Sequence, residues 1–395
     1  MLKDLEARFQ SCLEALNQAP LLVDQKQLYR EHSKTGLLMD TFRLMMEGAS
    51  KKRIDPESTE QLRTYLYQDL KLPVFSRTPK GTASVDTPTV LRLQRELDRS
   101  FLRYLLSYRE VASAHKHLKT LHSKMKDGYV YPELSNHCST LRLYSYLITM
   151  AEDGKRCILP GEGHVFVQAD YRQQELAIVA CLAGETGLAE AIAAGEDPHE
   201  LTARQLFTST TMTEKEREVG KQTNYAILYQ TTPDGLAWHL GIPRDEAEAL
   251  IQRWYRGYPR IEAWIASQKA FLEKNGYTES AFGLKSYIRS GLPKGKAYDK
   301  EVRRCLNALI QSVGSVFLKQ AVIRAFDVGL DVVLPRHDAL VVRSQKGHVD
   351  RTIRQLRDAM VVTWMSNQFD VEVQVGTTIA MEKPTEEEAK KCSGI

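Results

Sequence analysis

The pattern of hydrophobic and polar positions predicts a helical first third of the chain. Apolar residues recur at helical spacing over residues 1–50, and no strand-type alternation interrupts them. The segment 76–89 is rich in Ser, Thr, Pro and Gly, which is typical of an exposed loop. From about 90 to 126 the helical spacing returns, now with many basic residues. We therefore predict a long two-helix arm with a polar tip over residues 30–126.

After residue 128 the pattern mixes strands with helices. The predicted elements are a buried strand ending in an acid at 164–170, a mainly helical stretch at 174–275, a helix at 300–328, a hairpin with an acid at its turn at 331–342, and an alternating strand at 371–376. The strands lie far apart in the sequence. This order predicts an α+β fold whose small sheet is assembled from distant segments.

Composition indicates an ordinary soluble globular protein. Hydrophobic residues make up 43% and charged residues 26% of the 395 positions. The net charge of +4 neither requires nor excludes a nucleic-acid partner, because the distribution of charge matters more than its sum. The six cysteines form no C-x-x-C pair, which argues against a structural zinc site and favours reduced thiols in a cytosol.

The sequence shows no signal for export or membrane insertion. No apolar run approaches the length of a membrane span, and the N-terminal MLKDLEARFQ carries both acids and bases, unlike a secretory signal. We therefore expect a cytoplasmic protein without membrane contact.

Two aspartates at predicted strand ends offer metal chemistry. Asp170 closes the strand at 164–170, and Asp338 lies at the hairpin turn beside His337. Each alone is more often a helix cap or a turn residue. Brought together in one sheet, such carboxylates bind hard cations such as Mg²⁺, and paired ions stabilise the attacking and leaving oxygens of a phosphoryl displacement.

A helical segment at 216–230 supplies a complementary face. Arg217, Lys221 and Tyr225 are spaced i, i+4 and i+8, and Tyr229 continues the row. Cations neutralise phosphates and aromatic rings stack on bases, so this face suits a nucleoside triphosphate. Taken alone, such a row is more often a solvated basic face with aromatic anchors in the core.

Together these elements resemble the motifs of the family A DNA polymerases. ADYRQQELA (169–177) resembles motif A (DYSQIEL), KQTNYAILYQ (221–230) motif B (KxxNFGxxYG) and RHDALVV (336–342) motif C (HDE). Flanking family segments are matched in the same order by IDPESTEQLRTYLYQDLKLPVFSRTPKG (54–81), DPHELTARQLF (197–207), RWYRGYPRIEAWI (253–265), GYTESAFGLKSYI (276–288) and RRCLNALIQSVGSVFLKQAVI (303–323). The resemblance runs from about residue 30 to 376.

The resemblance implies a right hand with a small antiparallel palm sheet, helical fingers and a helical thumb. The implied divisions are an N-terminal helical extension (1–29), the thumb (30–127), a first palm part (128–185), the fingers (186–289) and a second palm part with a C-terminal tail (290–395). The implied activity extends a primer with dNTPs on primer–template DNA, in replication or repair. The implied setting is a bacterial cytoplasm, either at the nucleoid or as a phage or plasmid product. No processivity or replication partner is identified.

The resemblance also implies roles for single residues. Two Mg²⁺ ions, replaceable by Mn²⁺, would be held by Asp170, Asp338 and the backbone carbonyl of Tyr171, with Lys221 as a further catalytic residue. The implied substrate-binding residues are Arg217, Lys221, His199 and Gln173, Tyr225 stacking on the nucleotide, Tyr229 near the template base, and Glu175 as the steric gate against a 2′-OH. The implied DNA-binding residues are Arg142, Arg303, Asn307, Gln311 and His337.

The sequence departs from the family pattern in all three motifs. Motif C has Ala339 in place of the usual Glu, which predicts reduced or altered activity but not its loss. Motif A has Arg172 and Gln174 in place of Ser and Ile, and motif B has Ala226 and Gln230 in place of Gly.

Two alternatives stay open. A single-subunit RNA polymerase shares the palm and fingers, but Glu175 would block a ribose 2′-OH. A catalytically impaired DNA-binding relative is favoured by Ala339. Because the polymerase region fills nearly the whole chain, we also expect neither a 3′–5′ exonuclease nor a 5′-nuclease domain. Tyr225, where many relatives carry Phe, implies ready use of dideoxynucleotides.

Overall fold

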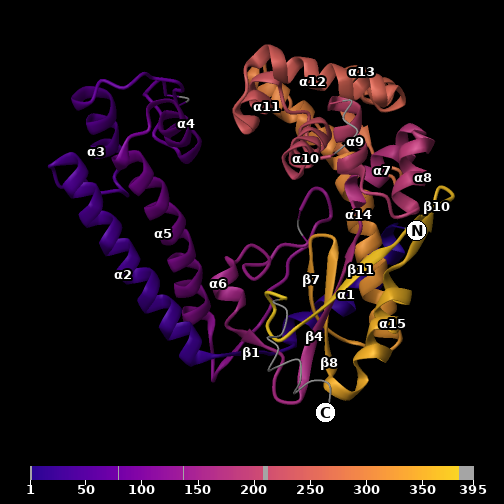
Figure 1. The fold of residues 1–395 in the computed structure, drawn as a ribbon. Coiled ribbons are helices and arrows are strands. Elements are labelled where there is room, and N and C mark those ends of the chain that lie inside the picture. The colour runs from indigo at the N-terminus through magenta and orange to yellow at the C-terminus, as the bar shows by residue number, and fades with distance from the viewer. Residues whose placement is uncertain (1, 79, 137, 208–211, 382–395) are drawn as a thin grey trace.

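The structure, a computed structural model, describes residues 2–78, 80–136, 138–207 and 212–381. It has three regions (Figure 1): an arm (residues 25–124), a body built on a four-stranded sheet, and a helical lobe (residues 174–275). The arm and the lobe rise from opposite sides of the body (Figure 1). The charged tail that ends the sequence lies outside the described residues from position 382 onward.

The arm consists of two long helices with a small tip. α2 (Gln25–Ser50) packs along α5 (Ser100–Lys124), and the tip contains α3 (Thr59–Arg63), the π-helical turn η1 (Thr64–Asp69) and α4 (Thr87–Leu97). The tip has its own apolar core, separate from that of the body. The continuous helix predicted from 90 to 126 is two helices, because Asp98 adopts a left-handed conformation (φ 39°) and its N–H bonds back to the Gln94 carbonyl.

The first fifty residues are not all helical, which corrects the prediction. α1 (Leu2–Gln18) ends before Pro20, and the short strand β1 (Leu21–Val23) precedes α2. β1 pairs with β2 (Tyr129–Val130) and β3 (Ile158–Leu159) in a small antiparallel sheet, next to which lies α6 (Glu152–Lys155). α1 packs on the body, where the buried Lys319 ammonium contacts both Glu6 carboxylate oxygens at 2.7 and 2.9 Å.

The body sheet is antiparallel and has the order β11-β4-β8-β7. Its strands are β4 (His164–Tyr171), β7 (Asp331–Arg336), β8 (Ala339–Gln345) and β11 (Val371–Gly376). α14 (Lys296–Asp327) and α15 (Val349–Met360) pack against it, and η2 (Lys346–His348) and the hairpin of β9 (Val362–Trp364) with β10 (Asn367–Phe369) complete the body. The sheet thus joins segments about 170 to 200 residues apart, as the strand patterns predict.

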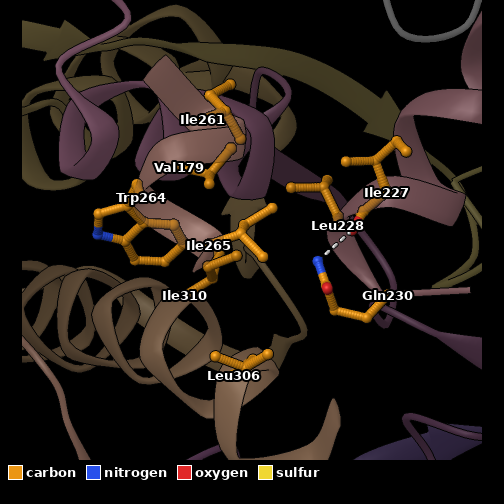
Figure 2. Close-up of a pocket in the computed structure, with 9 residues that line it drawn as sticks. All are labelled: Val179, Ile227, Leu228, Gln230, Ile261, Trp264, Ile265, Leu306 and Ile310. Carbon is orange, nitrogen blue, oxygen red and sulfur yellow. Dashed lines mark hydrogen bonds between the residues drawn. The ribbon is translucent and has the colours of Figure 1, made fainter. Parts of the chain in front are cut away.

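The helical lobe inserts between β4 and α14. It contains α7 (Gln174–Ala183), α8 (Thr186–Ala193), α9 (Pro198–Phe207), α10 (Glu214–Leu228), α11 (Pro233–Leu240), α12 (Arg244–Gly257) and α13 (Pro259–Asn275), followed by the hairpin of β5 (Tyr277–Glu279) and β6 (Lys285–Tyr287). Side chains from α7, α10, α13 and α14 surround a small apolar cavity of about 10 Å³ (Figure 2). A space of this size and lining is a packing defect of the core.

α14 is the central helix of the molecule. Within the described ranges it is the one helix long and apolar enough to cross a membrane, but 83% of its most apolar window is buried inside the protein. The sequence prediction of no span-length apolar run therefore understated this segment. Its apolar residues belong to the core, which they share with the sheet.

The tips of the arm and the lobe touch. Arg95 on α4 donates a hydrogen bond from Nη1 to the Trp238 carbonyl on α11 at 2.5 Å, and its guanidinium lies 5.6 Å from the centre of the Trp238 ring. In Figure 1, α4 and α11 face each other at the upper ends of the two regions. This contact is called the arm–lobe bridge below.

Candidate active site

One cleft of about 790 Å³ lies where the sheet meets the lobe. Most of the residues predicted from the sequence line it: Arg142, Asp170, Tyr171, Gln173, Glu175, His199, Arg217, Tyr225, Tyr229, His337 and Asp338. They come from the loop after the arm, from β4 and α7, from α9 and α10, and from the β7–β8 turn. Segments separated by nearly two hundred residues therefore converge on one polar space.

The sheet register brings the two predicted metal ligands together. Asp170 on β4 lies opposite Ala339 on β8, and Asp338 occupies the turn directly before Ala339. The Tyr171 amide donates to the Asp338 carbonyl at 3.2 Å, which ties the turn to the end of β4. His337 takes the positive φ (57°) that so tight a turn demands. The hairpin thereby holds Asp338 beside Asp170.

The two carboxylates disfavour each other's ionisation. Burial and, next in size, the nearby Asp338 together raise the pKa of Asp170 to about 7, against the opposing effect of Arg336. Burial also raises the pKa of Asp338. Two half-buried acids whose negative charges repel each other are suitable ligands for a hard divalent cation, and the Tyr171 carbonyl adds a neutral oxygen. The residues present therefore fit a Mg²⁺ or Mn²⁺ site.

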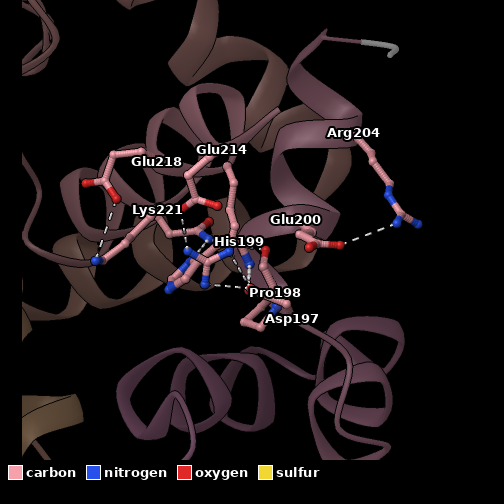
Figure 3. A network of polar contacts seen from close by, with 10 residues as sticks. Asp197, Pro198, His199, Glu200, Arg204, Glu214, Glu218 and Lys221 are labelled. Carbon is pink, nitrogen blue, oxygen red and sulfur yellow. Dashed lines mark hydrogen bonds and ion pairs between the residues drawn. The ribbon is translucent and has the colours of Figure 1, made fainter. Parts of the chain in front are cut away.

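The lobe presents the predicted row of α10 to the cleft, with one exception. Arg217, Tyr225 and Tyr229 line the cleft, and the two tyrosine rings stack at 6.4 Å between centroids. Lys221 lies outside the lining among the described residues, and its Nζ is 3.7 Å from Glu218 Oε2 (Figure 3). Its side chain is 41% exposed, so it is not packed into that position.

A partly buried polar network fixes the neighbouring wall, and Figure 3 shows part of it. Nε and Nη2 of Arg217 each lie 2.7 Å from Asp197 Oδ2, and the His199 amide donates to Asp197 Oδ1 at 2.8 Å. Burial opposes ionisation of Asp197, but these hydrogen bonds outweigh it and lower the Asp197 pKa. Arg217 is thus held in place by its own counter-charge.

His199 is a neutral ring whose Nε2–H donor has no hydrogen-bond acceptor in the described part of the chain. Burial lowers its pKa to about 4. Asn224 donates from Nδ2 to His199 Nδ1 at 3.0 Å, so the proton of the neutral ring sits on Nε2. Nε2 is buried without a partner among the described residues. Asn224 in turn accepts from Trp254 Nε1 at 2.6 Å and from the Thr202 hydroxyl at 2.9 Å, which locks the arrangement.

Glu175 joins the sheet side of the cleft to the lobe side. It lies in the first turn of α7, where the Arg142 guanidinium pairs with Oε1 and the Tyr229 hydroxyl donates to Oε2 at 2.8 Å. Gln173, just before α7, adopts a left-handed backbone (φ 47°) that turns the chain from β4 into the helix. Both carboxylate oxygens of Glu175 are therefore fixed in the lining of the cleft.

The predicted DNA-binding row on α14 lies outside this cleft. Arg303, Asn307 and Gln311 follow one another at i+4 and are all partly exposed on a helix that is largely buried from Cys305 to Ala325. The Oδ1 atom of Asn307 is buried and has no hydrogen-bond partner in the described segments. The row therefore forms one polar stripe on the core helix.

Sequence reasoning missed several residues of the cleft. Asp197 and Asn224 were given no role, although Asp197 opens the quoted DPHELTARQLF segment, because a polar residue inside a helical motif gives no sign of its burial. Glu372 and Gln374 on β11 also line the cleft. The period-two alternation of VEVQVG predicts that these two side chains share a face, but not that this face meets the site.

A sheet with paired acids between a helical arm and a helical lobe defines the class of right-hand polymerases. The structure of the polymerase domain of Pol1 from M. smegmatis, in complex with DNA primer-template and dNTP, superposes with a TM-score of 0.88 at 24% identity, covering 95% of this chain and 70% of that one. The fold is thus α+β with an antiparallel palm sheet, as predicted.

Sequence comparisons specify the family within that class. The family model for DNA polymerase family A matches residues 26–383. The thermostable DNA polymerase I of Thermus thermophilus is 27% identical over 339 residues, covering 81% of this chain and 41% of the relative. DNA polymerase I of Pseudomonas aeruginosa is 27% identical over 386 residues, covering 91% and 42%. This chain belongs to DNA polymerase family A and spans about two fifths of the length of these relatives.

Proposed function

We propose that this chain is a template-directed DNA polymerase that extends a primer with dNTPs. The observation that carries the proposal is the convergence in one cleft of Asp170 and Asp338 from the sheet with Arg217, Tyr225 and Tyr229 from α10. The two acids can bind cations and the α10 row can bind a nucleotide. The cleft would therefore hold the nucleotide triphosphate beside the metal ions that phosphoryl transfer requires. Membership of family A supports the same activity.

Two Mg²⁺ ions, or Mn²⁺ in their place, would be held by Asp170, Asp338 and the Tyr171 carbonyl. When bound, such ions activate the primer 3′-hydroxyl and neutralise charge on the phosphates. The two aspartates neutralise the cations in return, and the rigid hairpin keeps their carboxylates at a fixed separation. The raised pKa of Asp170, caused by burial and by Asp338, supports this role, because a cation would remove the repulsion.

The lobe would bind the incoming nucleotide. Arg217 would pair with the triphosphate, and the free Nε2–H of His199 would donate to a phosphate oxygen, with Gln173 nearby on the sheet side. Lys221 follows Arg217 by one helical turn, and its exposed side chain can leave Glu218 for the triphosphate, where it would act as a catalytic cation. Tyr225 would stack on the nucleotide.

Glu175 would select the sugar of the incoming nucleotide, and Tyr229 would lie next to the template base. The carboxylate of Glu175 is fixed by Arg142 and by the Tyr229 hydroxyl, so it cannot swing away from a 2′-OH that entered the same space. This fixed position argues against the alternative of an RNA polymerase. Tyr229, a residue that is 37% exposed, would lie next to the templating position.

The primer–template duplex would lie between the arm and the lobe. His337 at the cleft, Arg142 beside Glu175, and the α14 row of Arg303, Asn307 and Gln311 would contact it near the primer end. The Asn307 Oδ1 atom, buried and without a hydrogen-bond partner among the described residues, supports this, since a donor from the duplex would satisfy it. Basic residues of α4 and α5 would follow the phosphates without reading sequence. The relatives come from bacteria, so we place the activity in a bacterial cytoplasm.

Primer extension tests the proposal directly. The chain is incubated with a primer–template, dNTPs and Mg²⁺ or Mn²⁺, and parallel reactions contain rNTPs. We expect extension with dNTPs in strong preference to rNTPs. Preferential use of rNTPs would establish the RNA polymerase instead. Duplex binding without extension under either metal would establish the catalytically impaired relative that Ala339 favours.

A further inference from the structure

A row of three side chains crosses the body sheet at the metal site. Asp170 on β4 pairs in register with Ala339 on β8 and, on its other side, with Glu372 on β11. Residues directly opposite each other in antiparallel strands point to the same face, with Cβ atoms about 5 Å apart. Ala339, Asp170 and Glu372 therefore form one row, and Asp170 and Glu372 line the same cleft.

The row lacks an acid on one side of Asp170 and has one on the other. Position 339 is where motif C of the resembling family usually carries Glu, and here it is a buried Ala. Glu372 stands at the mirrored position across Asp170. The sheet register thus keeps a third carboxylate next to the aspartate pair, although it comes from a different strand.

Glu372 is not committed to a structural role. Its side chain is 64% exposed, and its Oε1 lies 3.4 Å from Arg172 Nε, which forms no hydrogen bond with a described residue. No group of three His, Cys, Asp or Glu side chains in the described residues is close enough to ligate one ion directly. A role for Glu372 at the metal site therefore operates through water rather than by direct ligation.

We propose that Glu372 supplies the third carboxylate of the metal site, from β11, in place of the acid that is absent at position 339. Its carboxylate accepts hydrogen bonds from the water shell of the cation held by Asp170. It also adds a negative charge on the β11 side of Asp170. Arg172 is its resting partner and competes with the cation for it. This inference rests on the proposed metal-dependent function and assigns to it a positioning residue.

Mn²⁺ binding to the whole chain, followed by the loss of the free-ion EPR signal, tests the proposal without any catalytic readout. We expect Glu372→Gln to weaken Mn²⁺ affinity about tenfold, which is typical for loss of an outer-shell partner. Arg172→Gln is expected to tighten binding about twofold, because it removes a nearby cation and releases Glu372. Glu248→Gln, which removes a partly exposed acid paired with Arg244 outside the cleft lining, is expected to leave affinity unchanged.

The variants separate the inference from the proposed function. Asp170→Asn and Asp338→Asn are expected to abolish Mn²⁺ binding, and retained binding in both would overturn the metal site itself. Glu372→Gln with wild-type affinity would overturn the role of Glu372 while leaving that site intact. If Arg172→Gln weakened binding as much as Glu372→Gln, Glu372 would merely hold Arg172, and the proposal would be wrong.

Discussion

The two walls of the cleft, one formed by the lobe and the other by the sheet, differ in how their charged side chains are compensated. On the lobe, Arg217 and Asp197 neutralise each other, and His199 is buried as a neutral ring held by Asn224. On the sheet, Asp170 and Asp338 lie together and nearby arginines compensate them only in part, so burial and repulsion raise the pKa of Asp170 to about 7. The charges of the lobe wall compensate each other within the protein, whereas those of the sheet wall would be compensated by the proposed cations. Rigid binding surfaces and metal sites differ in this respect.

The largest expected effect follows from removing one acid of the sheet wall. Asp170→Ala or Asp338→Ala is expected to reduce single-turnover primer extension by roughly a thousandfold or more, because the cations lose a ligand. Primer–template affinity, measured by fluorescence anisotropy, is expected to stay largely intact. Retained synthesis in either variant would refute the metal role of the pair.

The same wall gives a stability test with the opposite sign. A carboxyl whose folded pKa is raised loses stability as pH rises from its unfolded pKa near 4 towards 7. In metal-free buffer at pH 8, Asp170→Asn is therefore expected to raise the free energy of unfolding by about 2 kcal/mol. Urea denaturation with and without Mg²⁺ measures this, and added Mg²⁺ is expected to shrink the gain.

A smaller effect is expected when the lobe wall loses the positive charge of Arg217. Arg217→Ala is expected to raise KM for dNTP by about 10- to 100-fold, the equivalent of losing charge-assisted hydrogen bonds. Steady-state primer extension gives the value. Arg244→Ala removes an arginine that also pairs with a helical neighbour but lies outside the cleft lining, and it is expected to leave KM unchanged. Equal effects in both variants would contradict a specific triphosphate contact.

His199, on the lobe wall, is expected to make the free energy of unfolding depend on pH. Its folded pKa of about 4 lies below the unfolded value near 6.5, so the folded state binds fewer protons and stability falls as pH drops through that window. Between pH 7 and pH 5 the contribution amounts to about 2 kcal/mol. His199→Gln is expected to flatten the difference between urea midpoints at these two pH values. An unchanged difference would show that His199 is protonated in the folded state.

The smallest effect is expected at Glu175, which joins the two walls. Glu175→Ala removes the fixed carboxylate from between Arg142 and Tyr229 and is expected to improve rNTP incorporation relative to dNTP by about tenfold. Competitive incorporation on one template measures the ratio. Glu175→Gln retains the bulk of the side chain and serves as the control, and a gain of the same size there would assign the discrimination to charge.

The strands and the acids of the sheet wall were predictable from the sequence. β4 covers the strand predicted at 164–170 and extends it by one residue, and β11 coincides with the alternating strand at 371–376. Six or more residues of burial pattern are enough for such a prediction. The strands β1, β2 and β3 have two or three residues each, so no periodicity marks them and their long-range pairing alone creates them.

The network of the lobe wall was much less predictable. The pairing of Asp197 with Arg217 and the burial of Asn224 depend on how α9 and α10 pack, and helical spacing along one segment carries no information about the other. Spacing did place Arg217, Tyr225 and Tyr229 on the cleft. It also placed Lys221 there, although a flexible side chain chooses among nearby partners, and in the structure Lys221 faces Glu218.

The arm–lobe bridge has a topological consequence. The arm and the lobe are joined at their bases by the body and at their tips by Arg95 and Trp238, so the protein forms a closed ring. A continuous duplex without an accessible end can enter or leave such a ring only when the bridge opens. One hydrogen bond and one cation–π contact are together worth about 1–2 kcal/mol, so the ring would open easily and yet slow the escape of a duplex bound as proposed between the arm and the lobe.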